Sequence, residues 1–89
     1  MSKNYYTNNP QSIMSCAVRN NLKKEIKGSV KTTVVEDTLI VDIYAVNGIV
    51  YRYTLRNLCE QIVQGLNSQM VAKNIVKQYR AYIKNLFFL

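Results

Sequence analysis

Apolar residues in the first third of the chain recur every three or four positions, which is the spacing of one face of an α-helix. Asn9 followed by Pro10 is typical of a helix start, because asparagine can cap free backbone amides and proline fits the first helical turn. Gly28 is a typical end. The pattern predicts a helix over about residues 10–27 whose apolar face holds Met14, Val18, Leu22 and Ile26, with Ile13 and Ala17 beside them.

Residues 29–54 are rich in Val, Ile, Thr and Tyr and are interrupted by two pairs of turn residues, a composition typical of β-strands. Asn47-Gly48 is a strong hairpin signal, since both residue types accept the positive φ of a type I′ turn. A two-residue turn there pairs Tyr44 with Tyr51. An equally tight turn at Glu36-Asp37 joins the first two strands. We therefore expect a three-stranded antiparallel meander.

These turns fix a register, and the register sorts the side chains onto two faces. The mostly apolar face is the expected core face, with Val30, Thr32, Val34, Leu39, Val41, Ile43, Ala45 and Val50. The other face groups tyrosines with polar residues, namely Lys31, Thr33, Ile40, Asp42, Tyr44, Tyr51 and Tyr53. On this second face Asp42 is expected to balance the charge of Lys31.

The C-terminal third shows helical spacing again. Thr54 is a candidate cap for a second helix with an apolar stripe of Leu55, Leu58, Cys59, Ile62, Val63 and Leu66. Residues 65–68 favour a break, with Ser68 as a fresh cap, although a continuous bent helix over 55–89 is the alternative. The third helix, from about residue 69 to the end, has the apolar set Ala72, Ile75, Val76, Tyr79, Ile83, Leu86 and Phe87.

The predicted fold class is α+β. A helix at the start is followed by a three-stranded antiparallel β-meander and by one or two C-terminal helices, with the helices packed on one sheet face. Residues 10–89 are expected to form a single domain after a flexible tail over 1–9. This order of elements resembles that of the double-stranded RNA-binding domain, and the basic last helix agrees with it. The family's basic loop between its second and third strands and its lysine-rich start of the last helix are not matched, so the resemblance implies topology alone.

Length and composition limit the classes of protein. The chain has 89 residues, 48% of them hydrophobic, which is enough for one core. No stretch reaches the roughly 18 apolar residues of a membrane-spanning helix, and the start lacks the apolar segment of a signal peptide. Two cysteines without metal-ligand spacing favour reduced thiols. We therefore expect a cytoplasmic protein, and the abundance of Asn, Lys, Ile and Tyr is a bias often seen in bacterial or phage genomes rich in A and T.

Candidate catalytic groups are few. The chain contains no histidine, its five carboxylates form no acid and base pair, and no phosphate-binding loop or metal motif is present. Cys59 falls on an apolar stripe and is expected to be buried and inert. Cys16 falls near Arg19 and Lys23, where positive charge favours the thiolate. We expect no enzyme, no catalytic residue, no metal and no cofactor.

Positive charge is the property that stands out. Twelve Lys and Arg against five Asp and Glu give a net charge of +7, and the predicted third helix contains no acidic residue. One basic line on that helix comprises Lys73, Lys77, Arg80 and Lys84, and the amides of Asn74, Gln78 and Asn85 flank it. A second basic line, on the first predicted helix, comprises Arg19, Lys23 and Lys27, with Lys24 nearby. Lysine is also the usual residue of a solvated helix face, but a face without acids favours phosphate contacts.

The sequence thus predicts a small basic non-enzymatic protein that contacts nucleic acid, or a complex that handles it, through these lines. The alternative is a protein-interaction module that acts on an acidic protein partner, such as an accessory or inhibitor protein of a phage or mobile element. That alternative uses Tyr44, Tyr51, Tyr53 and Phe87 and is compatible with a homodimer. No membrane and no small-molecule substrate are expected.

Overall fold

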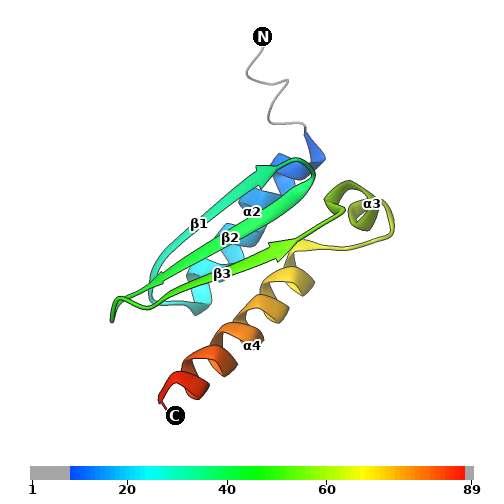
Figure 1. The fold of residues 1–89 in the computed structure, drawn as a ribbon. Coiled ribbons are helices and arrows are strands. Elements are labelled where there is room, and N and C mark those ends of the chain that lie inside the picture. The colour runs from blue at the N-terminus through cyan, green and yellow to red at the C-terminus, as the bar shows by residue number, and fades with distance from the viewer. Residues whose placement is uncertain (1–8, 88–89) are drawn as a thin grey trace.

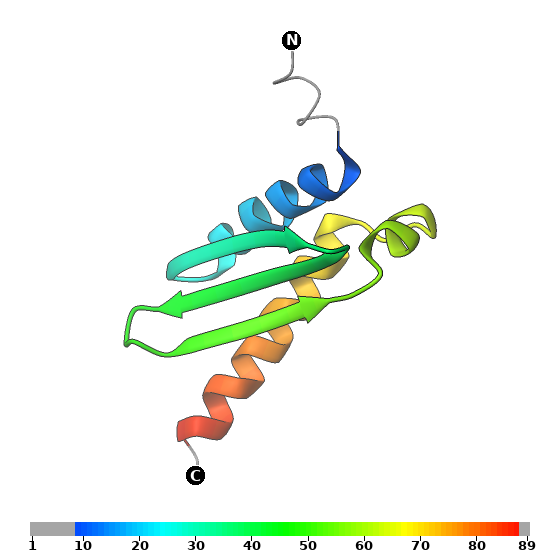
Figure 2. The same ribbon diagram turned by 45° about the horizontal axis from the view of Figure 1, so that its top comes forward.

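The computed structural model describes residues 9–87, without the side chain of Phe87. The elements are α2 (Pro10–Glu25), β1 (Gly28–Val35), β2 (Thr38–Ala45), β3 (Val50–Leu55), α3 (Leu58–Val63) and α4 (Ser68–Phe87). The sheet has the order β1-β2-β3, and α2 and α4 lie on one of its faces while the other face is open (Figure 1 and Figure 2). The predicted α+β fold is confirmed. The predicted tail lies outside the described residues, apart from Asn9.

The helix α2 begins where the sequence indicates. The Asn9 side chain accepts hydrogen bonds from the amides of Gln11 and Ser12, at 2.8 and 3.4 Å, and Pro10 occupies the first turn. It ends at Glu25, two residues earlier than predicted, because Ile26 is already extended. The four predicted core residues Met14, Val18, Leu22 and Ile26 are all buried.

The first hairpin has the tight turn that was expected. Glu36 and Asp37 have φ values of 48° and 61°, as a two-residue turn with a left-handed backbone requires. The turn pairs Val35 with Thr38, and the predicted register between β1 and β2 is confirmed along its length.

The second hairpin has a different turn, and its predicted register is wrong by one residue. In this loop only Gly48 has a positive φ, of 90°, so Asn47 does not adopt the type I′ conformation. Residues 46–48 form a three-residue loop closed by a bond from the Ala45 amide to the Ile49 carbonyl, at 2.8 Å. Tyr44 therefore pairs with Val50 instead of Tyr51.

This shift by one residue places each β3 side chain on the face opposite to the one that was predicted. Tyr51 and Tyr53 pair with Ile43 and Val41 and pack against the core under α4, whereas Val50 is 52% exposed. The prediction that both tyrosines share a face with Lys31 is thus wrong. The buried core comprises Met14, Val18, Leu22, Ile26, Val30, Leu39, Val41, Ile43, Leu58, Val71, Ala72, Ile75 and Val76.

The segment after the sheet differs from the expected second helix. Strand β3 continues through Leu55, so Thr54 caps no helix, and α3 is only six residues long. Of the predicted stripe only Leu58 is fully buried, while Val63 is 86% exposed. The predicted break is confirmed, but Asn67, not Ser68, caps α4 by accepting a bond from the Met70 amide at 2.9 Å.

Asp37 connects the first hairpin to two helices. Its carbonyl accepts a bond from the Leu58 amide at 3.0 Å. Its carboxylate accepts bonds from the Cys59 amide at 2.9 Å and from the Gln11 side chain at 2.6 Å. The bond from the Cys59 backbone is the main reason why the pKa of Asp37 lies below its ordinary value.

The open sheet face carries one close ion pair. Asp42 is 8% exposed and accepts two bonds from the Arg52 guanidinium, at 2.7 and 3.0 Å. Arg52 lies directly opposite Asp42 because of the shifted register, and its hydrogen bonds are the main cause of the lowered pKa of Asp42. Lys31 also lies opposite Asp42, as expected, and adds a weaker attraction, whereas the closer contact with Arg52 was not predicted.

Replacement of Gly28 by alanine tests the junction between α2 and β1. Gly28 has a φ of 124°, and a Cβ there would overlap the Tyr44 carbonyl. We expect Gly28→Ala to lower the free energy of unfolding by about 2–3 kcal/mol. Gly48→Ala is the control, because its φ is 90° but open space surrounds it, and about 1 kcal/mol is expected. Urea unfolding measures both variants, and an equal loss of unfolding free energy in the two would contradict the packing argument at Gly28.

The Asp42–Arg52 pair predicts a dependence of stability on pH. Because folding lowers the pKa of Asp42, its contribution is present above about pH 4 and is lost as the pH falls through the lowered pKa. We expect Asp42→Asn to be less stable at pH 7 by about 1–2 kcal/mol and to lose less stability on acidification than the wild type. Urea unfolding at neutral and acidic pH measures both. Asp37 is still present in the variant and accounts for the part of the acid-induced loss of stability that is left. If Asp42→Asn lost as much stability on acidification as the wild type, the proposed role of Asp42 would be wrong.

Candidate functional site

A groove of about 890 Å³ runs between α2 and α4 on the helical side of the molecule. Its α2 side is formed by Asn21, Lys24 and Glu25, and its α4 side by Gln69, Met70, Ala72, Lys73, Asn74, Val76, Lys77 and Arg80. The Asn21 side chain bonds the Ala17 carbonyl at 2.9 Å and reaches the Ser68 hydroxyl at 3.5 Å. The two helices are thus joined at one end of the groove.

The predicted basic line of α4 faces outward, and its members Lys73, Lys77 and Arg80 line this groove. Its four members Lys73, Lys77, Arg80 and Lys84 are exposed, and their spacing of four, three and four residues places them within roughly 60° of arc. The apolar face of α4, with Val71, Ala72, Ile75 and Val76 buried, points to the core. Packing of this apolar face therefore orients the charged one.

Acidic residues do little to balance this line. Glu25 is the carboxylate among the groove residues, and its Oε1 lies 3.6 Å from an Arg80 nitrogen, with both side chains more than half exposed. Lys24 adds a fourth cation to Lys73, Lys77 and Arg80 from the opposite wall. The groove thus concentrates positive charge, which attracts polyanions.

The second predicted line does not join this surface. Arg19 lines a separate hollow with Ser15, Cys16 and the β1 residues Thr32, Thr33 and Val34, and its Nε is buried without a hydrogen-bond partner. Lys27 follows the end of α2 and lies at another groove, beside the second hairpin. The structure brings Lys24 to the α4 line instead, a position set by the packing of two helices that the sequence pattern does not specify.

The amide side chains beside the α4 line have partners in the sheet. Asn74 donates a bond to the Tyr53 hydroxyl at 3.1 Å, and the Tyr51 hydroxyl donates to Gln78 at 3.5 Å. These contacts join α4 to β3. Asn74 and Gln78 thus have a structural role, and a contribution of their amides to phosphate binding stays a prediction.

The tyrosines predicted to form a partner surface are divided between two faces. The Tyr51 ring lies 5.8 Å from the Tyr79 ring in an edge-on arrangement and 5.1 Å from the Tyr82 ring. Tyr44 remains on the open face and is 43% exposed. The fourth member of the predicted set, Phe87, lies outside the described side chains. The three strand tyrosines thus form no shared patch.

Cys16 and Cys59 are the two cysteines of the chain. Both are exposed, so the prediction that Cys59 is buried is wrong, because α3 turns that residue outward. A hydrogen bond to Asp37 raises the pKa of Cys59 and favours its neutral thiol. Among residues 9–87, no cluster of three or more His, Cys, Asp or Glu side chains could hold a metal ion. In the same part of the chain, no helix has the length and apolar character needed to cross a membrane.

The new position of Tyr51 predicts a role in stability. We expect Tyr51→Ala to lower the free energy of unfolding by about 2–3 kcal/mol, since it removes contacts with two tyrosines of α4. Tyr44→Ala is the matched control and should stay within about 0.5 kcal/mol of the wild type. Urea unfolding of both variants gives the comparison. A larger loss for Tyr44→Ala would contradict the observed register.

Comparison with known proteins gives no match. No family model matches the sequence, and no curated protein or solved structure is significantly similar to the chain. Function is therefore inferred from the charges and shapes of this chain's own surfaces.

Proposed function

We propose that this chain is a non-enzymatic nucleic-acid-binding protein that holds a phosphate backbone in the groove between α2 and α4. Lys24, Lys73, Lys77 and Arg80 are the contacting residues, and Lys84 extends the line along α4. The observation that carries the proposal is the concentration of four cations around one carboxylate, which is itself opposite Arg80. Lysine and arginine contacts to phosphates supply most sequence-independent affinity for nucleic acid.

The groove residues favour a duplex over a single strand. Proteins that bind single strands combine a basic channel with aromatic side chains on which bases stack. The lining of this groove includes Met70, Ala72 and Val76 but no aromatic residue. Contacts are therefore expected with the backbone, where they position the duplex without reading its sequence.

The remaining expectations belong to the same proposal. The absence of histidine and of paired carboxylates supports a protein that binds and does not catalyse, without a cofactor. The proposed cytoplasmic location rests on two cysteines without metal-ligand spacing and on a sequence without a long apolar stretch. An origin in a phage or mobile element belongs to the alternative of a protein-interaction module.

Salt dependence of binding tests the groove directly. We expect fluorescence anisotropy with a labelled DNA duplex to show log affinity falling linearly with log salt, at a slope of about −3 to −4 for four phosphates. The double variant Lys73→Gln/Lys77→Gln loses two phosphate contacts and should make the slope less negative by about two. Lys23→Gln/Lys27→Gln removes the same charge outside the groove and should change the slope less.

Two outcomes would overturn the proposal. Absence of duplex binding at about 50 mM salt would leave the positive charge without a nucleic-acid role. Equal effects of the two double variants would assign binding to the net charge and not to the groove. Tighter binding of a single strand than of a duplex would refute the duplex preference alone.

A further inference from the structure

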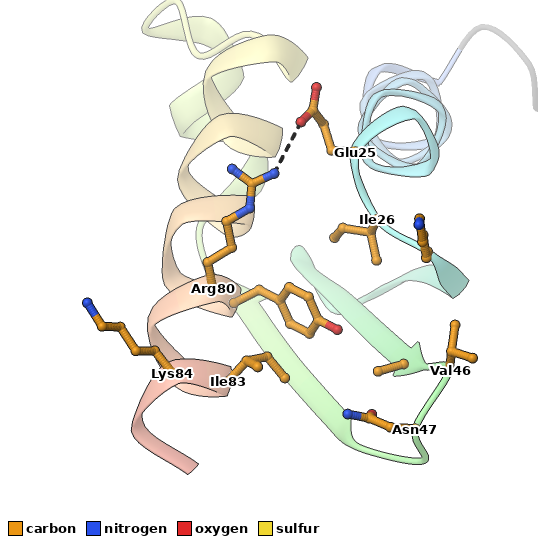
Figure 3. Close-up of a pocket in the computed structure, with 10 residues that line it drawn as sticks. Glu25, Ile26, Val46, Asn47, Arg80, Ile83 and Lys84 are labelled. Carbon is orange, nitrogen blue, oxygen red and sulfur yellow. Dashed lines mark ion pairs between the residues drawn. The ribbon is translucent and has the colours of Figure 1, made fainter. Parts of the chain in front are cut away.

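A second groove lies next to the first, at the C-terminal end of α2, between the second hairpin and the C-terminal half of α4 (Figure 3). Its volume is about 530 Å³. The apolar lining residues are Ile26, Ala45, Val46, Tyr79 and Ile83. Figure 3 shows Ile26, Val46 and Ile83 around this space, on the segment after α2, on the loop of the second hairpin and on α4.

Apolar surface continues from the groove onto its surroundings. Val46, at the hairpin, is 79% exposed, although it is a large apolar residue. On α4, Leu86 is 42% exposed and lies three residues beyond Ile83, on the same side of the helix. Exposed apolar residues that gather around a concave site are typical of a protein-binding surface.

The rim of this groove is basic. Lys27 and Lys84 are exposed lining residues, and Arg80 lies opposite Glu25, the carboxylate among the residues that line this groove. The rim therefore has two cations in excess, Lys27 and Lys84. An occupant with complementary charge carries carboxylates beside its apolar side chains.

We propose that this groove binds an acidic segment of another protein, which inserts one or more apolar side chains between Val46 and Ile83 and places carboxylates beside Lys27 and Lys84. A second copy of this chain, docked through the same face, would bring the lysines of both copies together and is disfavoured. Nucleic acid matches the lysines but leaves the apolar lining without a partner. This surface shares Arg80 and Lys84 with the proposed basic line of α4, and its other lining side chains that the proposal uses are separate from the phosphate contacts.

Selection from a randomised peptide library tests the proposal. A displayed library of roughly 12-residue peptides is selected on the intact chain, and the recovered peptides are measured by anisotropy. We expect enrichment of Asp and Glu next to Leu, Ile or aromatic residues. Val46→Ser should weaken their binding at least tenfold, and Lys27→Gln/Lys84→Gln should weaken it several-fold, most strongly at low salt.

Matched variants separate the groove from general effects. Val63→Ser changes the same residue type at a similarly exposed position, 86%, at the opposite end of the sheet, and should leave peptide affinity unchanged. Val46→Ser should also leave duplex binding unchanged, which keeps this test distinct from that of the first groove. Circular dichroism of each variant confirms that it is folded.

Several results would overturn the inference. Failure to recover any peptide, recovery of basic or uncharged peptides, or equal binding by wild type and Val46→Ser would each exclude an acidic occupant in this groove. Sedimentation velocity over a range of concentrations provides a further check. Self-association that Val46→Ser abolishes would show that a second copy covers the groove, and loss of duplex binding in Val46→Ser would assign the groove to nucleic acid.

Discussion

The register between β2 and β3 is the constraint on which the contact between the sheet and α4 depends. The three-residue loop closed at Ala45 and Ile49 places Tyr51 and Tyr53 on the core face, under α4. The Tyr51 ring then contacts Tyr79 and Tyr82, and hydroxyl bonds join both strand tyrosines to α4. With the two-residue turn, these tyrosines would lie on the open face and α4 would have no aromatic anchor in β3. The loop length thus adds an aromatic contact with β3 to the packing of the apolar face of α4 on the core.

The orientation of α4 in turn determines where its charge lies. One side of the helix packs on the core, and the side with Asn74 and Gln78 bonds to β3. Only the remaining side is free to carry Lys73 and Lys77 along the groove with α2. The position of the basic line therefore follows from the contacts of α4 with the core and with β3. Its charges are not needed to stabilise the fold. Their excess over acidic residues is the feature that folding alone does not explain.

Much of the fold could be predicted because the signals are local. The apolar spacing from Met14 to Leu22 and the cap at Asn9 depend on neighbours within one helical turn, and both are observed. The second hairpin could not be predicted in the same way, since Asn-Gly is compatible with two loop lengths and tertiary packing chooses between them. The helix expected from Leu55 failed for a similar reason. Its apolar stripe matched a helix, but the pairing of Leu55 with Leu39 extends the strand and shortens the helix.

The candidate sites show a similar limit. Spacing along α4 predicted one basic line correctly, but the partner of that line comes from α2, and no pattern within α2 distinguishes Lys24 from Lys23. The Glu25–Arg80 pair shows how closely the two proposed surfaces are arranged, because both residues line both grooves. An exposed pair of this kind adds little to stability, so its position matters more than its strength. It separates a groove with four cations and no aromatic residue from one that is mainly apolar with a basic rim. This difference in lining is the reason why we propose different partners for the two grooves, a phosphate backbone for the first and an acidic protein segment for the second.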